Sequence, residues 1–152
     1  MSYGRSLPDG QTYRQKYMAE VGAQLDMERV HFVGRIPYPV FLNLLQISSV
    51  HVYLTYPFVL SWSLLEAMSA GCAIVASNTA PLREAIEHDK TGRLVDFFDH
   101  AALAEQVCDL LDHPEERQRL GRNARAFAKS HYDLRAVCLP KQLEWVESLP
   151  LS

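Results

Sequence analysis

Residues 57–71 combine serines, apolar side chains and a single acid in a pattern that could bind a phosphorylated ligand. Their sequence, PFVLSWSLLEAMSAG, runs from a turn into a helix expected over residues 63–70, with Gly71 as its stop. Free backbone N–H groups at a helix N-terminus attract anions, phosphates in particular. Glu66, the one acid, would repel a phosphate but could accept hydrogen bonds from vicinal hydroxyls such as those of a ribose.

The same residues also have a purely structural interpretation. Ser63 and Glu66 are spaced as a capping box, in which each side chain satisfies a backbone donor of the other and nothing is bound. Spacing alone favours this cap, because such motifs have many structural matches.

Other kinds of site are not indicated. The six histidines are scattered and do not have the spacing of metal ligands, so no metal cofactor is expected. The three cysteines are an odd number and far apart, which argues against a disulfide framework or a zinc site and for a reducing compartment. A net charge of −3 leaves no basic surface for nucleic acid.

The elements that would position the serine-rich segment alternate between short apolar runs and amphipathic stretches. This alternation predicts an α/β fold with a doubly wound, Rossmann-like parallel sheet. Strands are expected at 29–33, 50–55, 73–77 and 93–95, and helices at 11–25, 39–47, 63–70, 80–87, 101–111, 114–130 and 134–148. Thr79 and Asp99 are expected N-caps, Pro114 opens a helix, and Pro140 is expected to bend the last one.

The alternation also predicts where ligands bind and how the chain is divided. In open parallel sheets, ligands lie beyond the carboxyl ends of the strands, here residues 34–38, 56–63 and 77–81. Residues 1–10 are expected to be a loop, and residues 11–152 a single partial domain that lacks its first strands. No run approaches the ~18 apolar residues of a membrane span, and the start does not have the layout of a signal peptide.

Three stretches of the chain resemble a known family in wording, order and spacing. They are HFVGRIPYPVFLNLLQISSVHVYLTYPFVLSWSLLEAMSAGCAIVAS, NTAPLREAIEHDKTGRLVDFFDHAALAEQV and HPEERQRLGRNARAFAKSHYD. From Val30 to about Tyr132 the chain is similar to the C-terminal domain of family 4 retaining glycosyltransferases of the GT-B fold. The resemblance implies an incomplete C-terminal, donor-binding half of such an enzyme, with a helical tail.

The resemblance implies transfer of a sugar from a nucleotide diphosphate donor to an acceptor hydroxyl, with retention of the anomeric configuration. Glu66 matches the second of two family glutamates and would bind the donor ribose. The position eight residues before it holds Phe58, where the family has its first glutamate. We therefore expect an apolar loop to hold the donor, through Phe58 and the backbone of Val59, Leu60, Ser61, Trp62 and Ser63.

Further matches to the family lie after two other expected strands. Gly34 and Arg35 match the position where the chain passes the nucleobase, although Gly34 could simply ease a turn. Thr79, Pro81 and Glu84 match the turn after the third strand, although a capping Thr79 needs no ligand.

The resemblance also implies partners. The family uses an Arg and a Lys upstream, and an N-terminal acceptor domain, and these 152 residues contain neither, so the chain alone is expected to be inactive. The expected ligands are the nucleotide-sugar donor and a glycan or lipid-linked acceptor, with no metal. The expected location is cytoplasmic, or peripheral to the membrane in the full-length enzyme. Two rivals stay open: a sugar-nucleotide epimerase of GT-B shape, and a non-catalytic nucleotide-binding domain.

Overall fold

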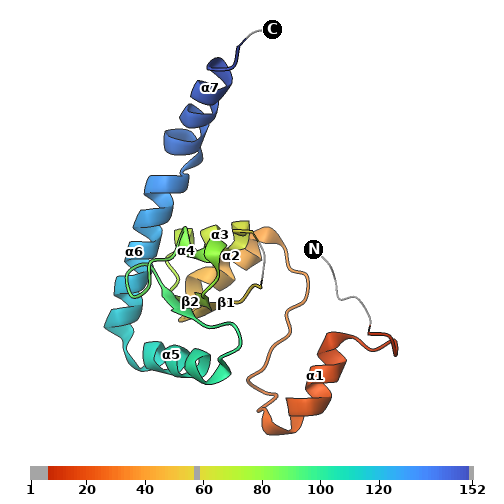
Figure 1. Cartoon of the computed structure of the whole chain (residues 1–152). Coiled ribbons are helices and arrows are strands. Elements are labelled where there is room, and N and C mark those ends of the chain that lie inside the picture. Colours follow the sequence, from red (N-terminus) through yellow and green to blue (C-terminus); the bar gives the residue numbers. More distant parts are fainter. Residues whose placement is uncertain (1–6, 57–58, 151–152) are drawn as a thin grey trace. The chain divides into compact units, whose positions relative to one another are not determined.

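The computed structural model describes residues 7–56 and 59–150, which belong to two compact units, Met1–Ile36 and Pro37–Ser152 (Figure 1). The expected division into a loop at 1–10 and one partial domain at 11–152 stays a prediction.

The first unit is built around one short helix. Helix α1, Tyr13–Val21, begins with a capping box: the Thr12 hydroxyl accepts from the Gln15 N–H, and the Gln15 side chain accepts from the Thr12 N–H. A 3-10 helix, η1 (Gly22–Gln24), follows it. These two elements account for most of the helix expected at 11–25.

The strand expected at 29–33 is not formed, and that prediction is wrong. The segment has no strand conformation, and Phe32 and Val33 are 46% and 54% exposed. Within this unit the described elements are helical, so the backbone of this segment has no ladder to join. Phe32 instead forms a cation–π contact, in which the Arg14 guanidinium lies over its ring, 3.9 Å from the ring centre.

The second unit contains a three-stranded parallel sheet in the order β1-β2-β3. The strands are β1 (His51–Tyr53), β2 (Ile74–Ser77) and β3 (Arg93–Val95), and Val52, Val75 and Arg93 are neighbours across it. Strand β1 is shorter than expected because its ladder ends at Tyr53. Beyond that point the buried Ser77 hydroxyl accepts from the Thr55 N–H at 3.0 Å and donates to the Thr55 carbonyl at 2.8 Å. A side chain therefore holds the strand's continuation.

Helices cover both faces of this sheet, which confirms the doubly wound architecture (Figure 1). Alternate residues of β2 point to opposite sides. Ile74 and Ala76 pack against α2 (Tyr38–Ile47), α3 (Trp62–Ala70), α4 (Ala80–Arg83) and the second half of α6 (Pro114–Tyr132). Val75 packs on the other side with α5 (His100–Asp112) and Leu120 of α6.

Most expected helix boundaries are confirmed by their caps. Gly71 ends α3 with φ 84°, a left-handed conformation that glycine adopts without strain. The Asp99 carboxylate accepts from the Ala102 N–H at the start of α5, and Pro114 lies in the first turn of α6. In the tail, a π-helix, η2 (Leu134–Cys138), leads into α7 (Leu139–Glu147), so Pro140 lies in a helical first turn.

Helix α4 is shorter than the helix expected at 80–87. The Thr91 hydroxyl accepts from the Glu87 N–H at 2.9 Å and donates to the Ala85 carbonyl at 3.3 Å. These bonds hold residues 85–87 against the turn that precedes β3, so the backbone leaves the helix after Arg83. A long-range contact thus overrides the local helical pattern.

Candidate functional site

The carboxyl edge of the sheet, formed by residues 54–56, 59–61, 78–79 and 96–99 after the three strands, brings several predicted site residues together. Helix α3 follows a parallel strand and therefore starts at this edge. Helix α2 leads back to the amino end of β1, so its first residue, Tyr38, also lies there.

The start of α3 is set by Ser61. Its hydroxyl accepts from the Ser63 N–H at 3.2 Å and is hydrogen-bonded to the Ser63 hydroxyl at 2.8 Å. The capping box expected between Ser63 and Glu66 is wrong, because the helix begins one residue earlier, at Trp62. Glu66 therefore lies in the second turn, where its carboxylate has no backbone donor to cap.

The Glu66 carboxylate is instead held by a side chain of another helix. The Tyr38 hydroxyl donates to Glu66 Oε1 at 2.9 Å, and this bond raises the pKa of the Tyr38 phenol, with burial and the carboxylate charge adding to the effect. Among the described residues, Glu66 forms no other side-chain hydrogen bond and no ion pair. Its second oxygen is therefore available to a hydroxyl donor.

The residues that lead into α3 differ in how far their side chains are exposed. Val59 and Trp62 are 65% and 86% exposed, whereas Leu60 packs against the core formed by α2, α3 and α4. Phe58 lies outside the described residues. The predicted role of this loop in holding a donor stays a prediction.

The turn after β2 holds Thr79, which occupies the N-cap position of α4 but does not cap it with its side chain. Its carbonyl accepts from the Leu82 and Arg83 N–H groups, while its hydroxyl is buried and has no hydrogen-bond partner among the described residues. The expected side-chain cap is therefore wrong. Pro81 lies in the first turn of α4, and Glu84 is the exposed residue that ends it.

A cleft of about 680 Å³ opens beside this turn, lined by Asn78, Arg83, Glu84, Glu87, His88 and Phe127 among others. Glu66 does not line it. Its lining carries charges of both signs, with Arg83 beside Glu84 and Glu87.

Gly34 and Arg35 belong to the first unit and are described within it. Gly34 has φ 60°, where a side chain would be strained, and Arg35 is exposed. The glycine is thus needed for the turn, while the predicted contact of both residues with a nucleobase stays a prediction.

Sequence reasoning missed an aromatic group at the carboxyl edge. Tyr56, after β1, lies 5.3 Å from both Phe97 and Phe98, after β3, measured between ring centres. Tyr56 and Phe98 are 60% and 65% exposed. The segment Phe97-Phe98 was a visible signal, but only the parallel sheet brings it to Tyr56.

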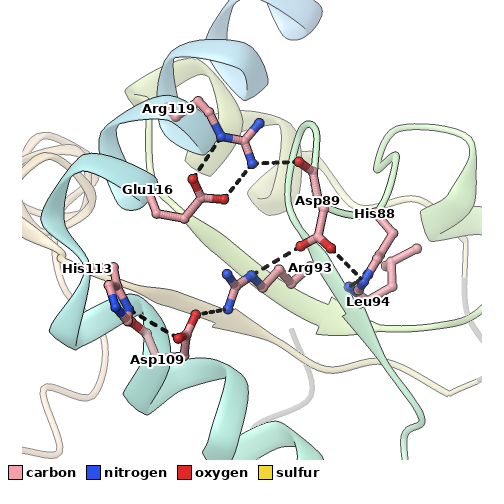
Figure 2. Close-up of polar contacts among 8 residues, drawn as sticks. All are labelled: His88, Asp89, Arg93, Leu94, Asp109, His113, Glu116 and Arg119. Carbon is pink, nitrogen blue, oxygen red and sulfur yellow. Dashed lines mark hydrogen bonds and ion pairs between the residues drawn. The ribbon is translucent and has the colours of Figure 1, made fainter.

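The opposite, amino edge of the sheet carries a polar cluster, drawn in Figure 2. Arg93, at the start of β3, pairs with Asp89 and Asp109, and Asp109 also pairs with His113. The hydrogen bond from Arg93 holds the pKa of the Asp109 carboxyl below its usual range. These ion pairs form a structural network that ties β3 to α5, and a pocket of about 520 Å³ opens beside it, lined by Asp89, Arg93 and Asp109 among others.

Two further properties bear on the class of protein. No helix in residues 7–56 and 59–150 is both long and apolar enough to cross a membrane. In the same residues, no three His, Cys, Asp or Glu side chains gather as they would around a metal ion. That no metal is used stays a prediction.

A parallel sheet with helices on both faces places this chain in the doubly wound class of α/β domains, in which ligands bind at the carboxyl edge of the sheet. The chain belongs to the family described as glycosyl transferases group 1, which it matches over residues 9–127.

Curated relatives agree with this assignment. The chain is 32% identical to a glycogen synthase of Mycobacterium tuberculosis over 111 residues. The aligned region covers 73% of this chain and 27% of that protein. The chain is 31% identical over 107 residues to a D-rhamnosyltransferase of Pseudomonas aeruginosa, with 68% and 28% covered. The chain thus spans about a quarter of the length of these relatives.

Solved structures share its fold. Sucrose-phosphate synthase of Thermosynechococcus elongatus matches with a TM-score of 0.77 at 26% identity, over 95% of this chain and 37% of that one. HepE of Anabaena, solved with UDP, matches with a TM-score of 0.79 at 24% identity, over 90% of this chain and 37% of that one. The C-terminal domain of a group 1 family glycosyl transferase from Francisella tularensis matches with a TM-score of 0.74 at 21% identity, over 85% of this chain and 67% of that one.

Proposed function

We propose that this chain is the donor-binding part of a retaining glycosyltransferase, which moves a sugar from a nucleotide diphosphate sugar to an acceptor hydroxyl. The observation that carries the proposal is Glu66, whose carboxylate is held by one oxygen and free at the other beside the start of α3. A carboxylate in that state can accept hydrogen bonds from the vicinal hydroxyls of a ribose. Relatives named as a glycogen synthase and a rhamnosyltransferase support the reaction class.

The diphosphate would interact with the loop more than with the helix. Ser61 already accepts from the N–H groups of Ser63, Leu64 and Leu65, through its hydroxyl and its carbonyl. Of the N–H donors in the first turn of α3, these three are therefore occupied, which leaves that of Trp62. A phosphate would have to bind the backbone of the loop at 59–62, so the ribose contact is the better-supported half of the proposed site.

Binding of UDP, GDP and ADP to the full chain, titrated by NMR, tests the role of Glu66. Glu66→Gln removes the charge at nearly constant shape, and Glu66→Ala removes the acceptor. A hydrogen bond to a charged group is worth about 1.5–3 kcal/mol, so the alanine variant should bind about 10- to 100-fold more weakly. Glu105→Gln, on the exposed side of α5, is the matched control. Unchanged affinity in both Glu66 variants would rule out the ribose contact.

We also propose that the 152 residues alone do not transfer sugar, and that donor binding needs no metal. Stabilising the charge of the leaving diphosphate is a large part of such catalysis, and the chain spans about a quarter of its relatives' length. The partners of the complete enzyme would be an acceptor domain and a glycan or lipid-linked acceptor, in the cytoplasm or at the inner membrane surface. Product formed by the isolated chain from UDP-glucose, or binding abolished by EDTA, would contradict these proposals.

A non-catalytic nucleotide-binding domain is the second candidate. Phe58, in place of an acid, favours it, because the residue expected near the transferred sugar cannot accept a hydrogen bond through its side chain. Nucleotide binding without transfer in the longer protein would support this candidate over the first.

A further inference from the structure

Tyr38 and Glu66 meet at the carboxyl edge although 28 residues separate them in the chain. Tyr38 is the first residue of α2, and Glu66 lies in the second turn of α3, which packs against α2. Their side chains form the one hydrogen bond that links these two helices through side chains among the described residues.

We propose that Tyr38 is a positioning residue, whose hydroxyl holds one oxygen of Glu66 so that the other oxygen faces the 2′-hydroxyl of the ligand's ribose. The inference rests on the proposed function of Glu66 and goes beyond it, because it makes selection of ribonucleotides over deoxyribonucleotides depend on a residue that does not touch the ligand.

The backbone around Tyr38 is built to keep its side chain still. Pro37 occupies the N-cap position with φ −60°, and Pro39 follows in the first turn of α2. Each proline ring fixes its own φ, which removes backbone freedom on both sides of the tyrosine. The Tyr38 ring also packs against Phe41, with ring centres 6.3 Å apart. The phenol is therefore presented from a rigid support.

The chemistry of the two side chains makes Tyr38 the donor and Glu66 the acceptor of their hydrogen bond. An ionised carboxylate only accepts, and a tyrosine hydroxyl below its pKa donates. The phenol is protonated at neutral pH, and its hydrogen bond to Glu66 raises its pKa further, so Tyr38 is the donor of this bond. Without this bond the long Glu66 side chain samples more rotamers, and ordering it on binding costs free energy.

A structural role alone does not account for the pair. Tyr38 is 58% exposed, and hydrogen bonds that compete with water add little to the free energy of unfolding. Replacing the hydroxyl by hydrogen should therefore leave the fold intact while it frees the Glu66 carboxylate.

The test combines two proteins with two ligands. The nucleoside diphosphate that binds most tightly among UDP, GDP and ADP is titrated, with its 2′-deoxy counterpart, into the full chain and into Tyr38→Phe. We expect the variant to bind the ribonucleotide about 3- to 10-fold more weakly, the range of one net hydrogen bond, and to bind the deoxynucleotide unchanged. Tyr17→Phe, on a helical tyrosine that is 53% exposed, is the matched control.

Each outcome decides between the inference and the function on which it rests. Equal weakening of both ligands, or no weakening of either, overturns the role of Tyr38. If Glu66→Ala removes the preference for the ribonucleotide while Tyr38→Phe keeps it, the inference fails and the proposed function stands. If Glu66→Ala keeps that preference, or if none of the three diphosphates binds, both fail. In the double variant, the loss should not exceed that of Glu66→Ala, because Tyr38 acts through Glu66.

Discussion

The two edges of the sheet are built in opposite ways. At the amino edge, α6 packs closely across the end of α3, and a network of charged side chains ties the start of β3 to α5. At the carboxyl edge the loops carry exposed aromatic rings and a half-buried carboxylate with one free oxygen. The two edges thus differ in how closely their helices pack and in which groups they expose.

At the amino edge, the backbones of α3 and α6 are in direct contact. A Cβ placed on Gly121 would lie 2.1 Å from the Gly71 carbonyl oxygen, so the backbones of α6 and α3 touch. Farther along α6, Arg119 and Asn123 donate to the carbonyls of Asp89 and Lys90 in the turn before β3. Backbone groups that have no partner in the sheet are thus satisfied by α6.

Gly121→Ala changes the close packing at the amino edge and should have the largest effect on the free energy of unfolding. In an exposed helix this change would stabilise by about 1 kcal/mol, because alanine has the higher helix propensity. Here the methyl group forces α6 away from α3, and overpacking should lower the free energy of unfolding by about 2 kcal/mol or more. Urea denaturation measures it, with the exposed neighbour Arg122→Ala as control. A stabilised variant would mean that the amino edge is not closely packed.

Ser77→Ala should have a smaller effect, concentrated at the carboxyl edge. The change removes both hydrogen bonds to the Thr55 backbone and should cost about 1–2 kcal/mol in unfolding free energy. Hydrogen exchange at the Thr55 amide should accelerate, while amides of α6 should keep their protection. Asn78→Ala, at the exposed next residue, serves as the comparison. Uniform acceleration in both regions would show that the edges are not independent.

Asp109→Asn should have the smallest effect, and one that depends on pH. Arg93 keeps its second partner, Asp89, and the Asp109 side chain is 40% exposed, so solvent screens the pair. Because its pKa is lowered in the folded state, mainly by the hydrogen bond from Arg93, the Asp109 carboxyl stabilises the fold above its ordinary pKa of about 4. This contribution is lost as the pH falls through the lowered pKa.

Chemical denaturation from pH 8 to pH 3 should therefore show wild type more stable at neutral pH, with the difference closing in acid. The His113 pKa is raised, first by its hydrogen bond to the Asp109 backbone and then by the Asp109 charge. The part that comes from the charge should add to the difference below about pH 6.5 and fade as the pH rises. Glu105→Gln on the same helix is the control. If the difference in unfolding free energy between wild type and Asp109→Asn did not vary with pH, the Asp109 carboxylate would not contribute to stability through its charge.

The element order was predictable because its signals are local. An apolar run, a turn residue and an amphipathic stretch recur along the chain. The helix stop at Gly71 and the helix starts at Asp99 and Pro114 lie where the preference of each residue type places them. Strand β3 has the bounds expected from sequence, since a glycine turn precedes it and a capped helix follows it.

The candidate site was predictable only in part. Glu66 stands out as the lone acid in an apolar segment, but the bond that holds it comes from Tyr38, on a different helix. The helix start at Ser61 was missed because two serines in the same segment both fit a cap, and spacing does not choose between them. Phe58 lies outside the described residues, so the departure from the family pattern is known from sequence alone.

By itself, then, the sequence determined the alternation of strands and helices, the caps that end them and the family to which the chain belongs, because these depend on neighbours within a few residues. Only the tertiary structure decided that residues 29–33 form no strand, that Gly121 touches the backbone of α3, and that a tyrosine holds Glu66. Those features depend on which distant segments become neighbours. Packing and hydrogen-bond pairing across the sheet set that arrangement, and local propensity does not contain it.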